Sequence, residues 1–142
     1  MTLRLADVKI GTEVPARAFR ITRGDLVRYA GASGDFNLIH WNERVAHEVG
    51  LPDVIAHGMY TMALAVQVVT DWAGDPGAVL NYSVRMSRPV VVPDDEVGAT
   101  LEIAGLVAAI NEDGTVRVDL TATCAGVSVL ARPQVTLRLR SA

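Results

Sequence analysis

The sequence has little cysteine, little lysine and no long hydrophobic run. Its single cysteine, Cys124, excludes an intramolecular disulfide and the cysteine cluster of a structural zinc site, so we expect a reducing compartment. The most apolar stretch, residues 54–69, contains His57, Gly58 and Gln67 and is shorter than the roughly 20 residues that a membrane-spanning helix needs. These absences predict a chain that does not depend on disulfides and does not enter a membrane.

Residues 1–9 contain no apolar run that ends at a small-residue cleavage site, which argues against a signal peptide and predicts a cytoplasmic location. The formal net charge of -3 argues against nucleic acid as the main partner. Apart from Lys9, all positive charge comes from arginine, which recognises phosphate and carboxylate groups better than lysine does. A codon bias would explain the same arginine excess without any binding role.

Half of the 142 residues are hydrophobic and a fifth are charged, a composition that can fill a core and that excludes a disordered chain. We see no internal repeat, no linker rich in proline, glycine or serine, and no block of like charge. The length is typical of one domain, so residues 1–142 are expected to form a single domain.

The first half of the chain predicts one strand and three helices. The strand covers residues 14–21, and Thr22 with Asp25 has the spacing of a capping box, which places a helix directly after the strand. A second, short helix is expected over residues 43–49, with Asn42 as its N-cap. A third helix is expected to start near Gly58 and to reach Trp72; it is apolar on nearly every side, so other structure must surround it.

From residue 79 onward the hydrophobic period changes to two. Strands are expected at about 78–88, 97–110, 115–125 and 128–140, with Asn111 to Gly114 as a hairpin turn. One strand, a helical middle and an antiparallel run indicate an α+β protein with a curved sheet wrapped around a long buried helix, the hot-dog fold. Because such a sheet keeps an open edge, we expect a homodimer or a heterodimer.

The densest candidate site lies between Tyr29 and His40. Within six positions, Asp35, Asn37 and His40 offer a carboxylate, a carboxamide and an imidazole, and an imidazole beside a carboxylate is suited to proton transfer near neutral pH. A purely structural alternative is that Asp35 and Asn37 only stabilise a turn. Two ligating groups fall short of a metal site, so no metal is expected.

A second candidate lies at residues 55–59, at the head of the apolar helix. An amide at a helix N-terminus is unpaired, and the Gly58 N–H could polarise a carbonyl because no side chain blocks access to it. Alternatively, Gly58 only permits a tight turn. His57 could act as a base, although a capping or packing role is the simpler interpretation, and His47 is expected to be solvated.

Residues 29–40 with Ala46, and the Ala-His-Gly-Met run at 56–59, closely resemble the two signatures of MaoC-like (R)-specific enoyl hydratases. The resemblance extends over nearly the whole chain and is greatest to the catalytic subunit of actinobacterial two-subunit (3R)-hydroxyacyl-carrier-protein dehydratases. The family has proline where this chain has Leu38, which makes the turn less rigid but leaves the polar residues in place.

The resemblance implies a hydro-lyase that interconverts (3R)-3-hydroxyacyl and trans-2-enoyl thioesters in lipid metabolism without a metal or a redox cofactor. It implies that Asp35 and His40 together hold the water or hydroxyl and transfer the proton. By the same resemblance, Asn37 positions this pair and the Gly58 amide stabilises charge on the thioester oxygen. Tyr60, as well as the two residues that follow it, could line the acyl channel or belong to the core.

The acyl group would arrive on coenzyme A or on an acyl carrier protein, and Arg85, Arg88 and Arg132 are candidates for binding the negative charges of either carrier. Two alternatives remain open. One is a hot-dog acyl thioesterase, although the apolar helix has no acidic residue before Asp71. The other is a substrate-holding subunit, or a subunit that works only with a paralogous hot-dog partner. An intact Asp35 and His40 favour the active subunit.

Overall fold

The computed structural model describes residues 2–141; Met1 and Ala142, which belong to the domain expected from the sequence, lie outside the described residues. The elements in chain order are η1 (Leu5–Asp7), β1 (Glu13–Ile21), α1 (Arg23–Ser33), η2 (Leu38–His40), α2 (Glu43–Glu48), α3 (Gly58–Ala73), η3 (Pro76–Ala78), β2 (Val79–Met86), β3 (Ala99–Ile110), β4 (Val116–Cys124), β5 (Val127–Ser128) and β6 (Leu130–Leu137). Every strand and helix expected from the sequence is present. The last expected strand is divided into β5 and β6.

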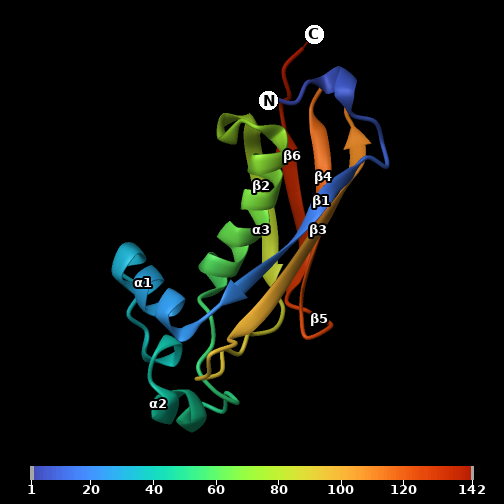
Figure 1. Cartoon of the computed structure of the whole chain (residues 1–142). Coiled ribbons are helices and arrows are strands. Elements are labelled where there is room, and N and C mark those ends of the chain that lie inside the picture. The colour runs from blue at the N-terminus through green and yellow to red at the C-terminus, as the bar shows by residue number, and fades with distance from the viewer. Residues whose placement is uncertain (1, 142) are drawn as a thin grey trace.

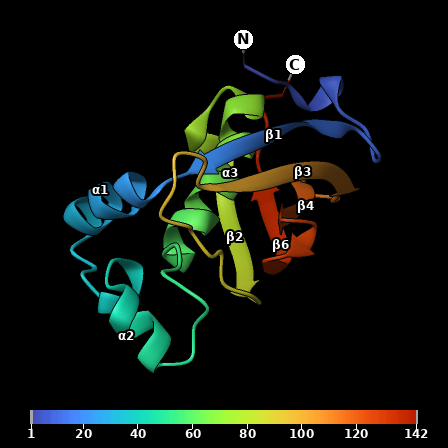
Figure 2. The same ribbon diagram turned by 60° about the horizontal axis from the view of Figure 1, so that its bottom comes forward.

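One antiparallel sheet in the order β1-β3-β4-β6-β2 forms the body of the molecule, with β5 paired to β4. Figures 1 and 2 show α3 lying along one face of this curved sheet, while α1 and α2 extend beyond one end of it. The expected hairpin joins β3 to β4, and Gly114 takes a φ of 77° there. The α+β hot-dog fold predicted from the sequence is confirmed.

Helix α3 has a buried face and an exposed face. Its buried side includes Leu64, Ala65, Val68 and Val69, which pack into the core with the inward side chains of the strands. On the opposite side Met59 is 60% exposed. The expectation that this helix is surrounded on nearly every side is therefore met only on the sheet side, because residues 2–141 supply one sheet and no second layer over the helix.

The caps predicted for the two short helices also form. The Thr22 hydroxyl accepts the Asp25 N–H at 3.3 Å, and the Asp25 carboxylate accepts the Thr22 N–H at 2.8 Å. The Asn42 side chain accepts the Val45 N–H at 3.1 Å and starts α2. At the end of α1, Gly34 is left-handed with a φ of 76°, so the chain reverses direction and the candidate loop begins at the next residue.

Within residues 2–141, none of the helices combines the length and the apolar character that a membrane-crossing helix requires.

Candidate active site

The loop from residue 35 to residue 41 is held by its own side chains. The Asp35 Oδ1 accepts the Asn37 N–H at 3.1 Å, and the Asn37 Oδ1 accepts the Ile39 N–H at 3.3 Å, which starts η2. The Trp41 Nε1–H donates to the Phe36 carbonyl at 3.1 Å and closes the loop. Both side chains thus stabilise the turn, as the structural alternative predicted. In Asp35 this uses only one of the two carboxylate oxygens.

The second Asp35 oxygen, Oδ2, faces the ring of His40. His40 is buried, and its Nδ1 lies 2.8 Å from the Ile55 carbonyl oxygen. Because a carbonyl oxygen can only accept, Nδ1 carries the proton, and the neutral ring presents the lone pair of Nε2. That nitrogen lies 3.9 Å from the Asp35 Oδ2.

A separation of 3.9 Å is too long for a direct hydrogen bond between the two groups. It is suited to one oxygen atom placed about 2.8 Å from both, at an ordinary hydrogen-bond distance. A water molecule there has two O–H groups to donate, one to each acceptor, and its oxygen lone pairs remain directed at a third atom. The pair is thus arranged to hold and deprotonate one water molecule.

His57 lies directly behind this pair. Its side chain is 1% exposed, and its ring stacks on the His40 ring with centroids 3.8 Å apart and a tilt of 22°. The His57 Nε2 lies 3.1 Å from the Asp35 backbone carbonyl oxygen, so its N–H donates a hydrogen bond to that oxygen. Burial lowers the pKa of His57 below its ordinary value, and a proton on His40 would act in the same direction. His57 occupies the N-cap position of α3 but makes no side-chain capping bond, so of the two structural roles expected for its side chain the packing role is the one observed.

Gly58 is the first residue of α3, where an amide has no acceptor inside the helix. No hydrogen-bond partner for this N–H is found within residues 2–141. Gly58 and His40 both line a cavity of about 380 Å³. An added Cβ at Gly58 would lie 3.2 Å from Cγ and Sδ of Met86, which lines the same cavity.

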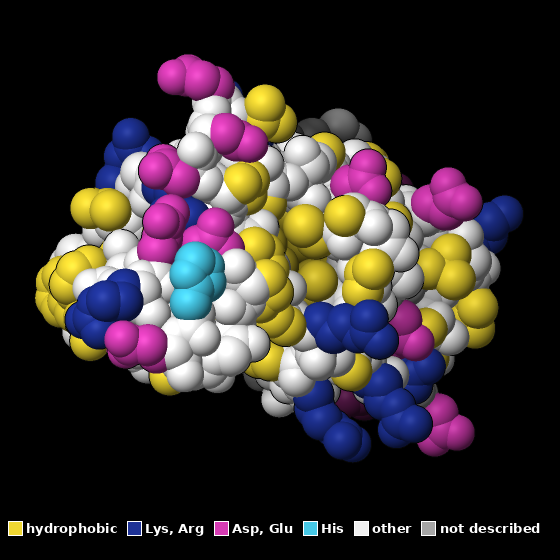
Figure 3. Space-filling view, turned by 90° about the horizontal axis from the view of Figure 1, so that it is seen from below, with side chains coloured by type: hydrophobic (Ala, Val, Ile, Leu, Met, Phe, Trp, Pro, Cys, Tyr) yellow, Lys and Arg dark blue, Asp and Glu magenta, His cyan; other side chains and the backbone are white. Residues whose placement is uncertain are grey.

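The cavity is mostly apolar and opens to solvent. Its lining residues come from η2, from the segment before α3, from α3 itself and from the two strand ends nearby: Ile39, His40, Ile55, Ala56, Gly58, Thr61, Met86, Ser87, Arg88, Pro89, Val90, Val129 and Leu130. Figure 3 shows the end of the molecule near α2, with hydrophobic side chains gathered in its middle and basic side chains along one side.

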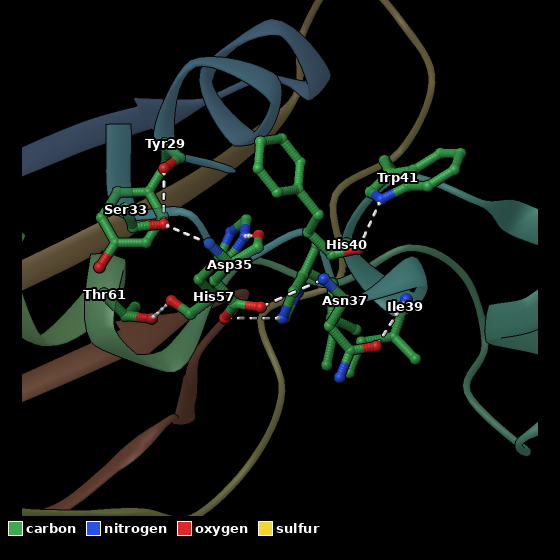
Figure 4. A network of polar contacts seen from close by, with 11 residues as sticks. Tyr29, Ser33, Asp35, Asn37, Ile39, His40, Trp41, His57 and Thr61 are labelled. Atoms are coloured by element: carbon green, nitrogen blue, oxygen red, sulfur yellow. Dashed lines mark hydrogen bonds and ion pairs between the residues drawn. The ribbon is translucent and has the colours of Figure 1, made fainter. Parts of the chain in front are cut away.

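The structure brings together three of the four predicted site residues and leaves the fourth apart. Asp35 faces His40, and Gly58 shares the cavity wall with His40. The Asn37 carboxamide is exposed and points to Ile39 instead of the Asp35 carboxylate (Figure 4). Asn37 therefore acts on the pair through its backbone amide and through the η2 cap.

Leu38, where the family signature has proline, is the first residue of η2. Proline suits this first helical position because the amide there needs no acceptor. Leucine keeps the same helical turn, held by the Asn37 cap, and its side chain is 42% exposed. The departure from the signature thus leaves the placement of His40 intact.

Of the further candidates from the sequence, Thr61 and Arg88 line the cavity, and the residues on either side of Thr61 are not among its lining residues. Arg85 and Arg132 lie together at a neighbouring hollow between β2 and β6. The acidic residue of α3, Asp71, is ion-paired with Arg17 of β1 and takes no part in the cavity. A thioesterase with an acidic residue on this helix has no support in this arrangement.

Asp35, His40 and His57 are close enough to be considered as a metal site, since one ligating atom from each lies within 4.8 Å of the others. The ring geometry disfavours it. An imidazole lone pair lies in the ring plane, and two planes stacked 3.8 Å apart cannot both point at one ion about 2.1 Å from each nitrogen.

The sequence alone did not predict that His57 contacts both Asp35 and His40. The available signal was a second histidine immediately before a glycine at the start of an apolar helix. Nothing in that spacing indicates a stack on His40, because the two residues are 17 positions apart and meet only when the segment before α3 packs against η2.

Comparison with known proteins identifies the family of this chain. The family model described as MaoC like domain matches residues 6–124. The chain is 34% identical over 125 residues to the (R)-specific enoyl-CoA hydratase of Rhodospirillum rubrum, covering 87% of this chain and 83% of that protein. It is 46% identical over 79 residues to 3-hydroxyacyl-thioester dehydratase X of Mycobacterium tuberculosis, covering 56% of this chain and 27% of that protein.

Solved structures give the same result. A MaoC-like dehydratase superposes with a TM-score of 0.93 at 43% identity, over 97% of this chain and 42% of that one. A chain of the ChsH1–ChsH2 complex from Mycobacterium tuberculosis shares the fold alone, with 23% identity over 93% of this chain and 98% of that one, and a TM-score of 0.81. The chain thus spans less than half the length of some of its relatives.

Proposed function

We propose, since this chain belongs to the family of MaoC-like domains, that it catalyses the reversible hydration of trans-2-enoyl thioesters to (3R)-3-hydroxyacyl thioesters. The observation that carries the proposal is the 3.9 Å gap between the Oδ2 of the half-exposed Asp35 and the Nε2 of His40, a residue that lines an apolar cavity together with Gly58. One water site and one free backbone N–H are what this addition needs. Residues 1–142 are proposed to form one hot-dog domain.

In the hydration direction, the two O–H groups of the water donate hydrogen bonds to Asp35 and His40 while the water oxygen forms a bond to C3 of the enoyl thioester. The C2–C3 π electrons move towards the thioester carbonyl, and the Gly58 N–H stabilises the negative charge on that oxygen. One proton of the water passes to the Asp35–His40 pair, and the pair delivers a proton to C2. The two coupled groups act as a unit, so each proton is assigned to the pair.

No metal or redox cofactor takes part in this mechanism. Addition of water changes no net oxidation state, and the acidity at C2 is supplied by the thioester and by the Gly58 amide. Arg88 at the cavity is proposed to contact the negative charges of the carrier, whereas Arg85 and Arg132 line a different hollow. This placement serves either coenzyme A or an acyl carrier protein.

The test replaces each member of the pair. Asp35→Asn and His40→Ala should lower kcat by about 10²–10⁴, the usual contribution of general acid–base groups, with little loss of fold. Hydration of crotonyl-CoA is followed by the loss of the enoyl absorbance, and circular dichroism checks the fold. His47→Gln is the matched control, because His47 is exposed and outside the cavity. Folded Asp35 and His40 variants with wild-type rates would exclude the mechanism.

The partner is proposed to be a second hot-dog subunit, either another copy of this chain or a paralogue. Three side chains near the site are large, apolar and about half exposed or more: Phe36 at 61%, Trp41 at 48% and Met59 at 60%. Surfaces of this kind mark protein contacts. The MaoC-like dehydratase of known structure is about twice as long as this chain, which covers 42% of it. A second unit of similar size would account for the remaining length.

A dependent subunit is the second candidate function, and the open apolar surface beside the site favours it. The purified chain is assayed alone, and its mass is measured by light scattering. An active dimer supports a homodimeric hydratase. An inactive or insoluble chain that gains activity only when co-expressed with a paralogous hot-dog protein supports the heteromer.

A further inference from the structure

His57 is a buried ionisable group that the proposed mechanism does not use. It is not among the residues that line the cavity, and its side chain is 1% exposed. It nevertheless contacts both members of the proposed pair, Asp35 through the backbone carbonyl and His40 through the ring. A group that holds both partners and touches no cavity surface can act only through them.

The contacts on the other side of His57 show how its ring is held. The Tyr29 ring of α1 lies 4.7 Å from it, and the Thr61 hydroxyl of α3 donates to the His57 carbonyl at 3.0 Å. The His57 ring is therefore enclosed between α1 on one side and His40 on the other. Its place is determined by two helices, whereas Asp35 belongs to an exposed loop.

The hydrogen bonds of His57 also determine its protonation. Nε2 carries a proton, because its partner is a carbonyl oxygen. Nδ1 is buried and has no hydrogen-bond partner in the described structure. A proton on Nδ1 would bury an N–H and a positive charge without an acceptor, which costs far more than a bare lone pair. His57 is therefore the neutral Nε2–H tautomer, the opposite of the tautomer of His40.

The ionisable groups that face His57 come from three elements. They are Asp35 from the loop after α1, His40 from η2 and Tyr29 from α1; Tyr60 of α3 packs on the far side of Tyr29. Burial keeps the pKa of His57 below its ordinary value despite the nearby Asp35 carboxylate. Of the two stacked rings, only His40 is placed to take up a proton.

We propose that His57 is a positioning residue that fixes the distance between the Asp35 carboxylate and the His40 ring. It anchors the Asp35 backbone to the start of α3 by one hydrogen bond and supports the His40 ring by stacking. As a neutral ring it also leaves the Nε2 of His40 as the one free imidazole nitrogen of the stacked pair that faces the Asp35 carboxylate. The catalytic consequence rests on the hydratase function proposed above.

The first experiment is independent of activity. Nitrogen-15 NMR of the wild-type rings is practical because the chain has 3 histidines, and His47→Gln identifies one of them. We expect a neutral Nε2–H tautomer for His57 that persists at a pH where His47 is protonated. An Nδ1–H tautomer, or titration of His57 together with His47, overturns the proposal.

The second experiment separates the two contacts. His57→Phe keeps a ring but loses the donor, and His57→Gln keeps a donor but loses the ring. Each should lower kcat by about 10- to 100-fold, the scale of a misplaced catalytic group, with a smaller change in KM because neither substitution alters the cavity lining. His57→Ala removes both the ring and the donor, so it should lower kcat more than either of these substitutions. Rates are measured at a temperature at which circular dichroism shows each variant to be folded.

A merely structural role gives a different result: folded variants that keep the wild-type kcat, which overturns the proposal. If the wild-type chain has no hydratase activity, the proposed function fails while this inference remains testable. In that case His57→Phe should still shift the amide nitrogen of Phe36, whose peptide bond contains the Asp35 carbonyl, and His47→Gln should not. An unchanged Phe36 amide overturns the anchoring role.

Discussion

Replacing Gly58 with alanine tests the part of the site that depends on a missing side chain. The new Cβ would lie 3.2 Å from Cγ and Sδ of Met86 and 3.4 Å from its Cε, so the Met86 side chain has to move by a few tenths of an ångström. Met86 is 48% exposed and unbranched, which makes this movement easy. Because alanine is a better helix former than glycine, by up to about 1 kcal/mol, the melting temperature should stay the same or rise.

Activity should fall while stability does not. The added methyl group and the displaced Met86 occupy the space beside the Gly58 N–H, where the thioester oxygen is expected to bind. Loss of an entire oxyanion-hole donor costs about 10²–10³ in rate, so a donor that is obstructed but still present should cost about 10- to 100-fold in kcat/KM. The assay is the hydration of crotonyl-CoA.

The matched control is Gly31→Ala in α1, where an added Cβ meets nothing within 4 Å. This control should gain about 0.5–1 kcal/mol of stability and keep full activity. A double variant with alanine at both Gly58 and Met86 shows whether the displaced Met86 side chain is the obstruction. If it is, the double variant should be more active than Gly58→Ala alone. Wild-type kcat/KM in a folded Gly58→Ala protein would refute the assignment of this amide.

Two further predictions concern stability. Tyr82 is partly buried, which raises its pKa to about 12, and its hydroxyl donates to the Met62 carbonyl at 3.1 Å. The contribution of this hydroxyl to folding stability is complete below the ordinary pKa of about 10 and is lost as the pH rises towards 12. Ultraviolet titration should show this phenolate last, and Tyr82→Phe should remove that step and cost about 1 kcal/mol in urea unfolding. Thr22→Ala removes the side-chain half of the capping box at α1 and should cost about 1 kcal/mol, whereas Thr22→Ser should cost less; equal melting temperatures for both variants would contradict this.

The elements and their order could be predicted from the sequence because their signals are local. The capping box at Thr22, the cap at Asn42 and the turn at Gly114 are each determined by neighbouring residues, and each forms as expected. The hydrophobic period of two residues after Val79 likewise predicted the strands of the second half. The division of the last strand into β5 and β6 could not be predicted.

The candidate site was only partly predictable for the same reason. Asp35 and His40 could be selected because an acid and an imidazole five positions apart suit proton transfer. The sequence could not show that the Asn37 carboxamide caps η2, because a carboxamide serves a cap and a catalytic pair equally well. It also could not show that one face of α3 stays open, since that depends on how far a single sheet reaches around the helix.

The sequence by itself determined the chemistry that is available: a carboxylate and an imidazole in one loop, and a glycine amide at the start of an apolar helix. Those identities and spacings follow from short-range turns and periodicity, which neighbouring residues control. Only the tertiary structure decided which nitrogen of His40 is free, because the carbonyl that binds the other nitrogen belongs to Ile55, 15 positions away. It also decided that His57 stacks behind that ring, because such contacts exist only after distant segments have packed together.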